Sequence, residues 1–163
     1  MLGSFIQKIH GAWRLSWQQK IWIIVLYPIS GIVRASVLVI PFKYLHKSLG
    51  IHSRNLQFCT VITESQLQKA RQIGNAIIIM SKYTPWESNC MVQAILARWV
   101  LSLYGIPYVM YMGAYMTKDR SEPMKAHAWI TAGPRIVVGA KGHQRYAIVS
   151  TFASKQLKSL IKQ

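Results

Sequence analysis

The sequence predicts an α+β fold in which helices come first and an antiparallel sheet follows. Apolar residues recur at helical spacing over residues 64–82 and again over 90–105, whereas short apolar runs separated by turn residues follow residue 105. A hydrophobic fraction of 52% in 163 residues is enough for one full core. We expect an N-terminal apolar helical segment, residues 1–50, and one domain, residues 51–163.

The N-terminal segment is predicted to be helical without forming a simple membrane span. Residues 5–19 have helical spacing, and residues 21–42 are almost wholly apolar, a length that suits a transmembrane helix. Pro28 and Gly31 interrupt the apolar run, and Arg34 is costly in lipid. We therefore expect two shorter helices forming a hairpin that lies on the domain, on a partner or on a membrane surface.

The elements up to the middle of the chain follow from their start and stop signals. Residues 50–62 are expected to be a linker with a short extended piece. Thr63 and Gln66 match a capping box, which begins a helix that runs to about residue 82. A loop over residues 83–89 precedes a helix that begins at Cys90 and ends at Gly105, a residue typical of helix C-termini.

The second half of the domain is predicted to form the sheet. A turn at Gly133-Pro134 separates two apolar runs and predicts a hairpin. A polar stretch that carries two of the four acidic residues indicates an exposed loop before it. The expected elements are a strand over 107–113, a loop over 117–125, hairpin strands over 126–132 and 135–140, a last strand over 146–150 and a basic helix over 153–162.

The charge balance restricts the kinds of partner. Lys and Arg number 20 against 4 Asp and Glu, so the net charge is +16. Such a surface attracts nucleic acid, anionic lipid or an acidic peptide. The basic residues form no long cluster and match no nucleic-acid-binding motif, so we expect no nucleic acid partner.

Cysteine and histidine spacing predicts neither a metal site nor a cofactor. The two cysteines, Cys59 and Cys90, make no Cys-x-x-Cys pair, and the five histidines lack zinc-ligand spacing. A Cys59–Cys90 disulfide is possible in principle. We see no cleavable signal peptide, and therefore expect a reducing, cytoplasmic location, with membrane association left open.

Cys90 and His127 are the candidate catalytic residues. A cysteine at a helix N-terminus lies at the positive end of the helix dipole, which favours the thiolate. An imidazole can pair with that thiolate and protonate a leaving amine. The alternative is a small buried hydrophobe and a structural histidine. Packing of one helix face on the sheet would bring Cys90 toward His127; the residues expected on that face are Ile95, Leu96, Trp99 and Leu103.

Four segments resemble a known family when taken in order and spacing. These are Cys90-Met-Val-Gln-Ala94, Leu103-Tyr-Gly-Ile-Pro107, Ala126-His-Ala-Trp-Ile130 and Arg135-Ile-Val-Val-Gly139. In residues 84–152 the chain resembles the leader peptidase of lasso-peptide biosynthesis, in the form whose leader-recognition domain is a separate protein. The resemblance implies a transglutaminase-like or papain-like cysteine protease core, with Cys90 as nucleophile and His127 as general base.

The resemblance also implies a reaction and partners. The enzyme would remove the leader of a ribosomally made precursor peptide and free the amine of the core peptide. An ATP-dependent macrolactam cyclase would then join that amine to an Asp or Glu side chain. Because the separate recognition protein holds the leader, we expect this chain to be weak or inactive alone. The net charge suits an acidic leader or an acidic recognition protein.

The third catalytic residue is not predicted. The family pattern usually has an Asp on the strand after the histidine strand, and that position falls near Gly139 and Ala140, where there is no carboxylate. No acid follows Glu122. The group that orients His127 is therefore a side chain from elsewhere, a backbone carbonyl, or absent; the polar candidates are Glu87, Asn89, Asp119 and Glu122.

Other functions stay open on the sequence alone. One is a different transglutaminase-like acyl transferase. Another is a non-enzymatic basic scaffold or membrane-surface protein, since residues 1–45 also suit contact with a membrane surface. A nucleic-acid binder would show salt-dependent binding that does not depend on Cys90. Trp86 and Trp129 are candidates for walls of a cleft, with core packing favoured for Trp129.

Overall fold

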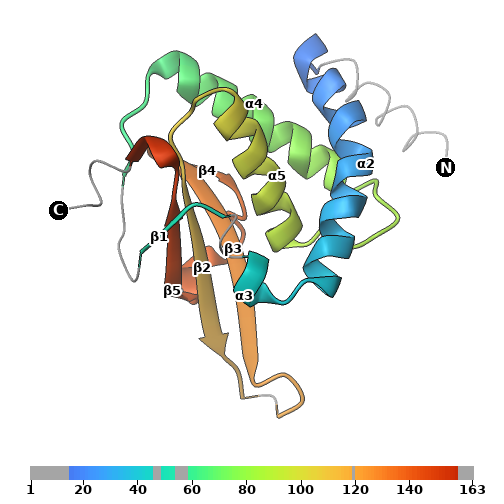
Figure 1. Ribbon diagram of the computed structural model, residues 1–163, viewed down its shortest axis with the longest axis vertical. Coiled ribbons are helices and arrows are strands. Elements are labelled where there is room, and N and C mark those ends of the chain that lie inside the picture. The colour runs from blue at the N-terminus through green and yellow to red at the C-terminus, as the bar shows by residue number, and fades with distance from the viewer. Residues whose placement is uncertain (1–14, 46–48, 54–58, 119, 158–163) are drawn as a thin grey trace.

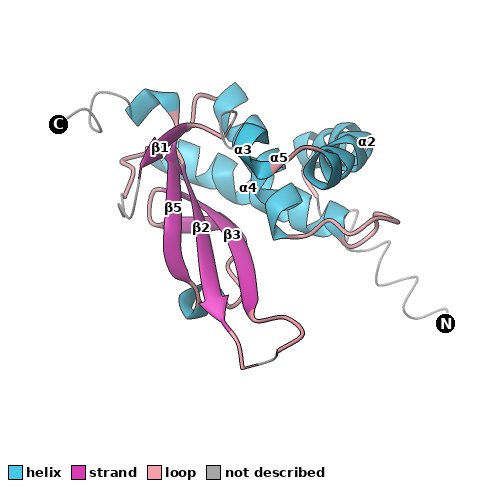
Figure 2. Ribbon diagram, turned by 60° about the horizontal axis from the view of Figure 1, so that its bottom comes forward, coloured by secondary structure: helices cyan, strands magenta, loops and turns pink. Residues whose placement is uncertain are grey.

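The computed structural model describes residues 15–45, 49–53, 59–118 and 120–157. It shows one antiparallel sheet with helices packed on it, which confirms the predicted α+β fold (Figure 1). The sheet lies on one side of the molecule, α4 and α5 lie against it, and α2 packs on the outside of these two helices (Figures 1 and 2). The helices are α2 (Trp17–Val39), α3 (Phe42–Leu45), α4 (Glu64–Ser81) and α5 (Cys90–Leu103).

The sheet has five strands in the order β1-β5-β2-β3-β4. The central β2 pairs with β3 along its whole length, and the turn at Gly133 leads into β4, as the hairpin prediction required. The β2 and β3 strands extend further than predicted, so the exposed loop between them is shorter. The strands are β1 (Ile51–Ser53), β2 (Val109–Met116), β3 (Met124–Ala132), β4 (Arg135–Val138) and β5 (Ala147–Ala153).

Short 3-10 turns flank the last strand. One, η2 (His143–Arg145), precedes β5, and the other, η3 (Lys155–Leu157), follows it. The predicted C-terminal helix over 153–162 lies partly outside the described residues, and its described part forms only the turn η3.

α2 is one continuous helix, so the predicted break at Pro28 is wrong. A capping box between Ser16 and Gln19 begins it, and Pro28 lies in its interior. A proline costs about 3 kcal/mol inside a helix because it removes one hydrogen bond. Packing offsets this cost, since Leu26 and Val33 on the buried face are each only 5% exposed. The helix predicted over residues 5–19 falls mainly on residues outside those described.

α4 forms as predicted, and its inner face contacts the sheet closely. The capping box of Thr63 and Gln66 is present, and the predicted apolar stripe is buried at Ile73 and Ile77. Gly74 faces β4, where an added Cβ would overlap the carbonyl oxygen of Val137. The absence of a side chain at this position therefore sets the distance between α4 and β4.

We expect Gly74→Ala to destabilise the protein by at least about 1 kcal/mol, because overpacking against backbone exceeds the gain in helix propensity. Urea denaturation measures this change. Asn75→Ala, at the neighbouring exposed position, is the control and should be neutral or slightly stabilising. A Gly74→Ala protein as stable as the wild type would show that α4 and β4 can separate without cost.

The buried face of α5 differs from the predicted one. Ile95 and Leu96 are buried as expected, but Trp99 is 42% exposed and Leu103 is 84% exposed. The prediction assumed that α5 contacts the sheet alone, whereas α5 also packs against α2 and α4. The face between these neighbours is the one that becomes buried, and its members are Val92, Ala94, Ile95, Leu96, Ala97, Val100 and Leu101.

Two apolar clusters occupy alternate positions of the sheet strands. Ala128 and Ile130 belong to the large cluster that contains the buried side chains of α4 and α5, which we call the helix-side core. Trp129 belongs instead to a smaller cluster with Val109 and Tyr111, which we call the Trp129 cluster. Successive side chains of a strand point to opposite faces, so the two clusters lie on the two faces of the sheet.

Candidate active site

Cys90 is the first residue of α5, as predicted. Asn89 caps the helix in an extended conformation, and its side-chain oxygen accepts a hydrogen bond from the backbone N–H of Val92 at 3.2 Å. The thiol is half-buried and packs against the helix-side core. The first N–H groups of a helix have no hydrogen-bond partner within the helix, and they form the positive end of its dipole. The thiol therefore lies where negative charge is stabilised.

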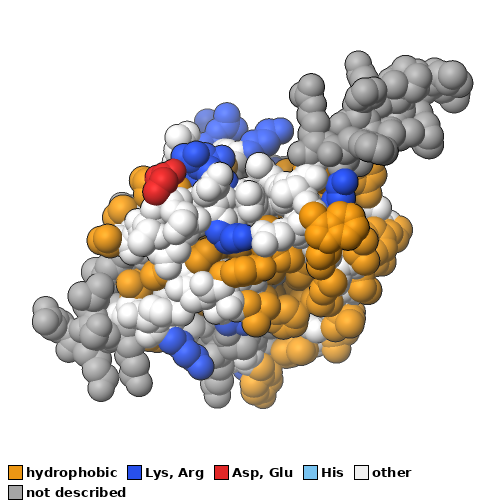
Figure 3. All heavy atoms as spheres, turned by 90° about the horizontal axis from the view of Figure 1, so that it is seen from above, with side chains coloured by type: hydrophobic (Ala, Val, Ile, Leu, Met, Phe, Trp, Pro, Cys, Tyr) orange, Lys and Arg blue, Asp and Glu red, His pale blue; other side chains and the backbone are white. Residues whose placement is uncertain are grey.

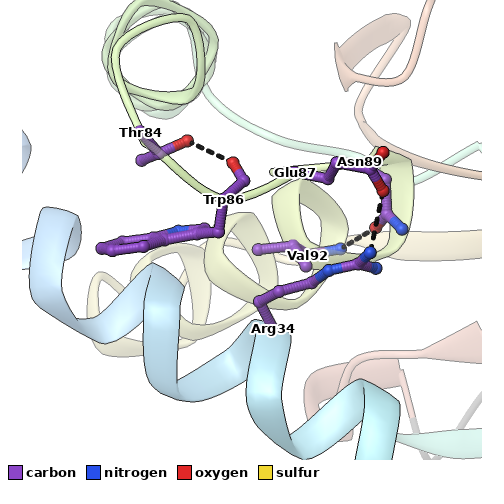
Figure 4. Close-up of polar contacts among 6 residues, drawn as sticks. All are labelled: Arg34, Thr84, Trp86, Glu87, Asn89 and Val92. Carbon is purple, nitrogen blue, oxygen red and sulfur yellow. Dashed lines mark hydrogen bonds and ion pairs between the residues drawn. The ribbon is translucent and has the colours of Figure 1, made fainter.

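The loop before Cys90 is held by its own hydrogen bonds. The Thr84 hydroxyl donates to the carbonyl oxygen of Trp86 at 3.0 Å (Figure 4). It also lies 3.2 Å from the carbonyl oxygen of Ser81 and 2.9 Å from the Ser88 hydroxyl. The Gln93 amide donates to the Ser88 carbonyl oxygen at 2.8 Å. These bonds connect the end of α4 to the first turn of α5 and so fix the position of the cysteine.

The same loop is fastened to α2. Trp86 Nε1 donates to the Ser30 hydroxyl at 3.0 Å, and its ring packs against Gly31. Arg34 and Glu87 form an ion pair at 2.8 Å (Figure 4). The Glu87 side chain is 81% exposed, so the pair contributes little stability but does specify the contact. Trp86 therefore joins the loop to α2.

His127 lies on β3 opposite Gly113 of β2. Its Nε2 atom is 2.8 Å from the carbonyl oxygen of Gly139. A carbonyl oxygen only accepts, so Nε2 carries the proton and Nδ1 is left to accept or exchange one. The ring is stacked on Trp129 with centroids 5.9 Å apart and lies 5.0 Å from the Tyr146 ring. These contacts set both the orientation and the tautomer of the imidazole.

The Gly139 carbonyl supplies the orienting bond for which the sequence left three options open. The predicted hairpin register placed Gly139 near His127. It did not show which atom of Gly139 would face the ring. The polar side chains considered for this role have other partners or lie outside the described residues: Asn89 caps α5, Glu87 pairs with Arg34, Glu122 pairs with Lys125 at 3.3 Å, and Asp119 is not described.

The structure does not join Cys90 to His127 by a hydrogen bond. The His127 ring stacks on Trp129 and so shares its face of β3, while the Cys90 thiol packs against the helix-side core. We expected Cys90 and His127 to approach each other across the helix–sheet contact, and the structure does not show them as a bonded pair. Their catalytic roles stay predictions. Trp129 is 4% exposed, so it is a core residue that also supports the His127 ring.

Among the residues that the structure describes, the remaining thiol and histidines do not form a second centre. Cys59 is exposed and free, and Cys90 is also a free thiol, so the two form no disulfide. The His143 ring lies 5.7 Å from Trp129, and its Nδ1 is 2.7 Å from the Ala140 carbonyl oxygen. Within the part of the chain that the structure describes, no group of three or more His, Cys, Asp or Glu residues could hold a metal ion.

A helix-borne cysteine followed by a strand-borne histidine in an α+β fold is a layout found in cysteine peptidases and related acyl transferases. The family model described as the transglutaminase-like superfamily matches residues 36–151, more than half of the chain. The chain belongs to the transglutaminase-like superfamily. The match begins inside α2 and includes both Cys90 and His127. Comparison with curated proteins and with solved structures gives no match.

We expect that placing the missing carboxylate by Gly139→Asp destabilises the protein by at least about 1 kcal/mol, because Gly139 has a left-handed backbone. A Cβ there would also overlap the Ala128 carbonyl oxygen. Thermal unfolding measures the loss. Ala140→Asp adds the same charge at an exposed neighbour and should be tolerated. An equally stable and more active Gly139→Asp protein would show that the hairpin accepts a carboxylate at this position.

Proposed function

We propose that this protein is a cysteine peptidase that removes the leader from a lasso-peptide precursor. The observation that carries the proposal is the position of Cys90 at the N-terminus of α5 in a transglutaminase-like domain. Superfamily membership supports thiol-dependent acyl chemistry, and the motifs around Cys90 and His127 support the peptidase assignment. The recognition protein that holds the leader and the macrolactam cyclase that uses the freed amine are the partners in this proposal.

The chemistry would proceed in two steps. The Cys90 thiolate attacks the scissile carbonyl, and the N–H groups at the start of α5 stabilise the oxyanion. The C–N bond then breaks as His127 gives its proton to the departing amine of the core peptide, which leaves the leader as a thioester on Cys90. His127 next takes a proton from a water molecule, whose oxygen attacks the thioester; the C–S bond then breaks, which releases the leader acid and restores the Cys90 thiolate.

His127 is suited to this exchange through Nδ1. Its Nε2–H donates to the Gly139 carbonyl oxygen, so Nδ1 is the ring nitrogen that is left to accept and release a proton. The proposal requires Cys90 to reach this nitrogen in the substrate-bound state, whereas in the free protein His127 lies on the Trp129 face of the sheet and Cys90 packs against the helix-side core. The same requirement would account for the weak activity that we expect of the chain alone. Binding of the leader with its recognition protein would bring the two side chains together.

The test is a reconstituted cleavage reaction. The full chain is mixed with precursor peptide in the presence and absence of the recognition protein, and the products are identified by mass spectrometry. We expect cleavage at one position and strong dependence on the recognition protein. An added amine distinguishes hydrolysis from acyl transfer, because a peptidase releases the leader as an acid whereas a transferase gives the amide. Absence of cleavage in the complete mixture would contradict the proposal.

A further inference from the structure

One side of α2 is an exposed apolar surface. Its side chains follow helical spacing, and the most exposed are Trp17 at 76%, Ile24 at 72% and Val39 at 79%. Figure 3 shows hydrophobic side chains gathered on the side of the molecule where α2 lies. We call this surface the α2 stripe; its members are Trp17, Ile21, Ile24, Val25, Ile32, Leu38 and Val39.

The α2 stripe is unusually long for a protein surface. From Trp17 to Val39 it extends about 33 Å at 1.5 Å per residue. By length and composition alone, α2 could cross a membrane, and only 22% of its most apolar stretch is buried in the protein. Monomeric soluble proteins rarely expose apolar patches of this extent, and such patches mark sites for a partner or a membrane.

The other side of α2 argues against a transmembrane orientation. Gln19 donates to the Gln72 carbonyl oxygen at 3.2 Å, and Ser30 accepts from Trp86. Leu26 and Val33 are buried against α4 and α5. A helix that crossed the bilayer would lose these contacts and would place Arg34, now paired with Glu87, in hydrocarbon. The helix can meet lipid only with its exposed side.

We propose that the α2 stripe binds the surface of a bilayer that contains anionic lipid, with α2 lying in the plane of the interface. The net charge of +16 attracts anionic headgroups, and Glu87, the acid that contacts α2, is paired with Arg34. Trp17 at one end and Tyr44 just beyond the other are exposed aromatic residues of the kind that favour the membrane interface. Apolar contact and basic charge together are the two components of interfacial binding.

The α2 stripe would also connect the membrane to α5, the helix that begins at Cys90. Ser30 and Arg34 lie on α2 and hold Trp86 and Glu87 of the loop before Cys90. Membrane binding in this orientation therefore leaves the loop attached and accessible. The proposal does not depend on which acyl-transfer reaction Cys90 performs.

Flotation with vesicles tests the proposal. The purified full chain is mixed with vesicles of phosphatidylcholine alone or of equal parts phosphatidylcholine and phosphatidylglycerol, at low and high salt. We expect wild-type protein to float with the mixed vesicles, less at high salt. Ile24→Gln/Ile32→Gln should bind at least about tenfold more weakly, because two exposed isoleucines lose their contact with lipid.

The matched control is Val61→Gln/Leu103→Gln, which changes side chains that are 94% and 84% exposed outside the stripe. It should float like the wild type. Trp17→Gln/Val39→Gln is a second stripe variant, and circular dichroism checks that each variant is folded. The proposal is overturned if wild-type protein does not float, if both stripe variants float like the control, or if an alkaline carbonate wash fails to release bound protein, which would indicate a span. If wild-type protein does not bind vesicles but binds the recognition protein through the α2 stripe, the surface is a docking site for a protein partner.

Discussion

Cys90→Ala is expected to abolish leader cleavage, with a loss on the order of 10³-fold or more, because the variant lacks the thiol that is proposed to form the thioester. The thiol is half-buried, and alanine is a small apolar replacement at a helix start, so the variant should fold. The measurement is the rate of leader cleavage with the recognition protein present.

Cys59→Ala is the matched control for this prediction. Cys59 is the other free thiol, and it is exposed on the segment before α4. Its removal should leave cleavage largely intact. Retained turnover by purified Cys90→Ala protein would exclude Cys90 as the nucleophile and, with it, the cysteine-peptidase proposal. Loss of activity in both variants, with both proteins folded, would indicate that the two thiols act together.

His127→Ala is expected to be as damaging as Cys90→Ala. Residues that act as one catalytic unit are strongly non-additive, so removal of either member costs nearly the whole rate enhancement. The double variant Cys90→Ala/His127→Ala should therefore be no slower than either single variant. The same cleavage assay measures all three proteins.

His143→Ala is the matched histidine control, since the His143 ring also lies beside Trp129 and is half-buried like His127. It should retain activity. Glu87, Asp119 and Glu122 changed singly to Ala should also retain substantial cleavage, because a backbone carbonyl already orients His127. A folded acid variant that falls to the Cys90→Ala level would identify that acid as the third catalytic residue and would refute a dyad.

Local signals in the sequence were sufficient for the order of the main elements and for the starts of α4 and α5. The capping box at Thr63 and Gln66 depends only on side chains three residues apart, so it predicted the start of α4 correctly. Gly133 predicted the β3–β4 turn for the same reason, since its backbone lies in the left-handed region that favours glycine. Placement of Cys90 at the start of α5 also followed from a local pattern of apolar residues.

Tertiary contacts decided the features that the sequence could not. Pro28 argues locally for a break, but packing of Leu26 and Val33 on α4 and α5 keeps α2 continuous. The face of α5 that became buried depended on α2, which the prediction had not placed against it. In both cases the burial of apolar surface against a distant segment outweighed a local preference.

The candidate site divides in the same way. Residue types and their order along the chain indicated Cys90 and His127, and the family resemblance indicated that a carboxylate is missing near Gly139. Only the folded hairpin showed that the Gly139 carbonyl oxygen lies 2.8 Å from His127 Nε2. Every residue has a backbone carbonyl, so residue identity does not predict which one will face the ring. The packing of the two side chains was likewise set by strand alternation and helix placement: His127 stacks on Trp129, and Cys90 contacts the helix-side core.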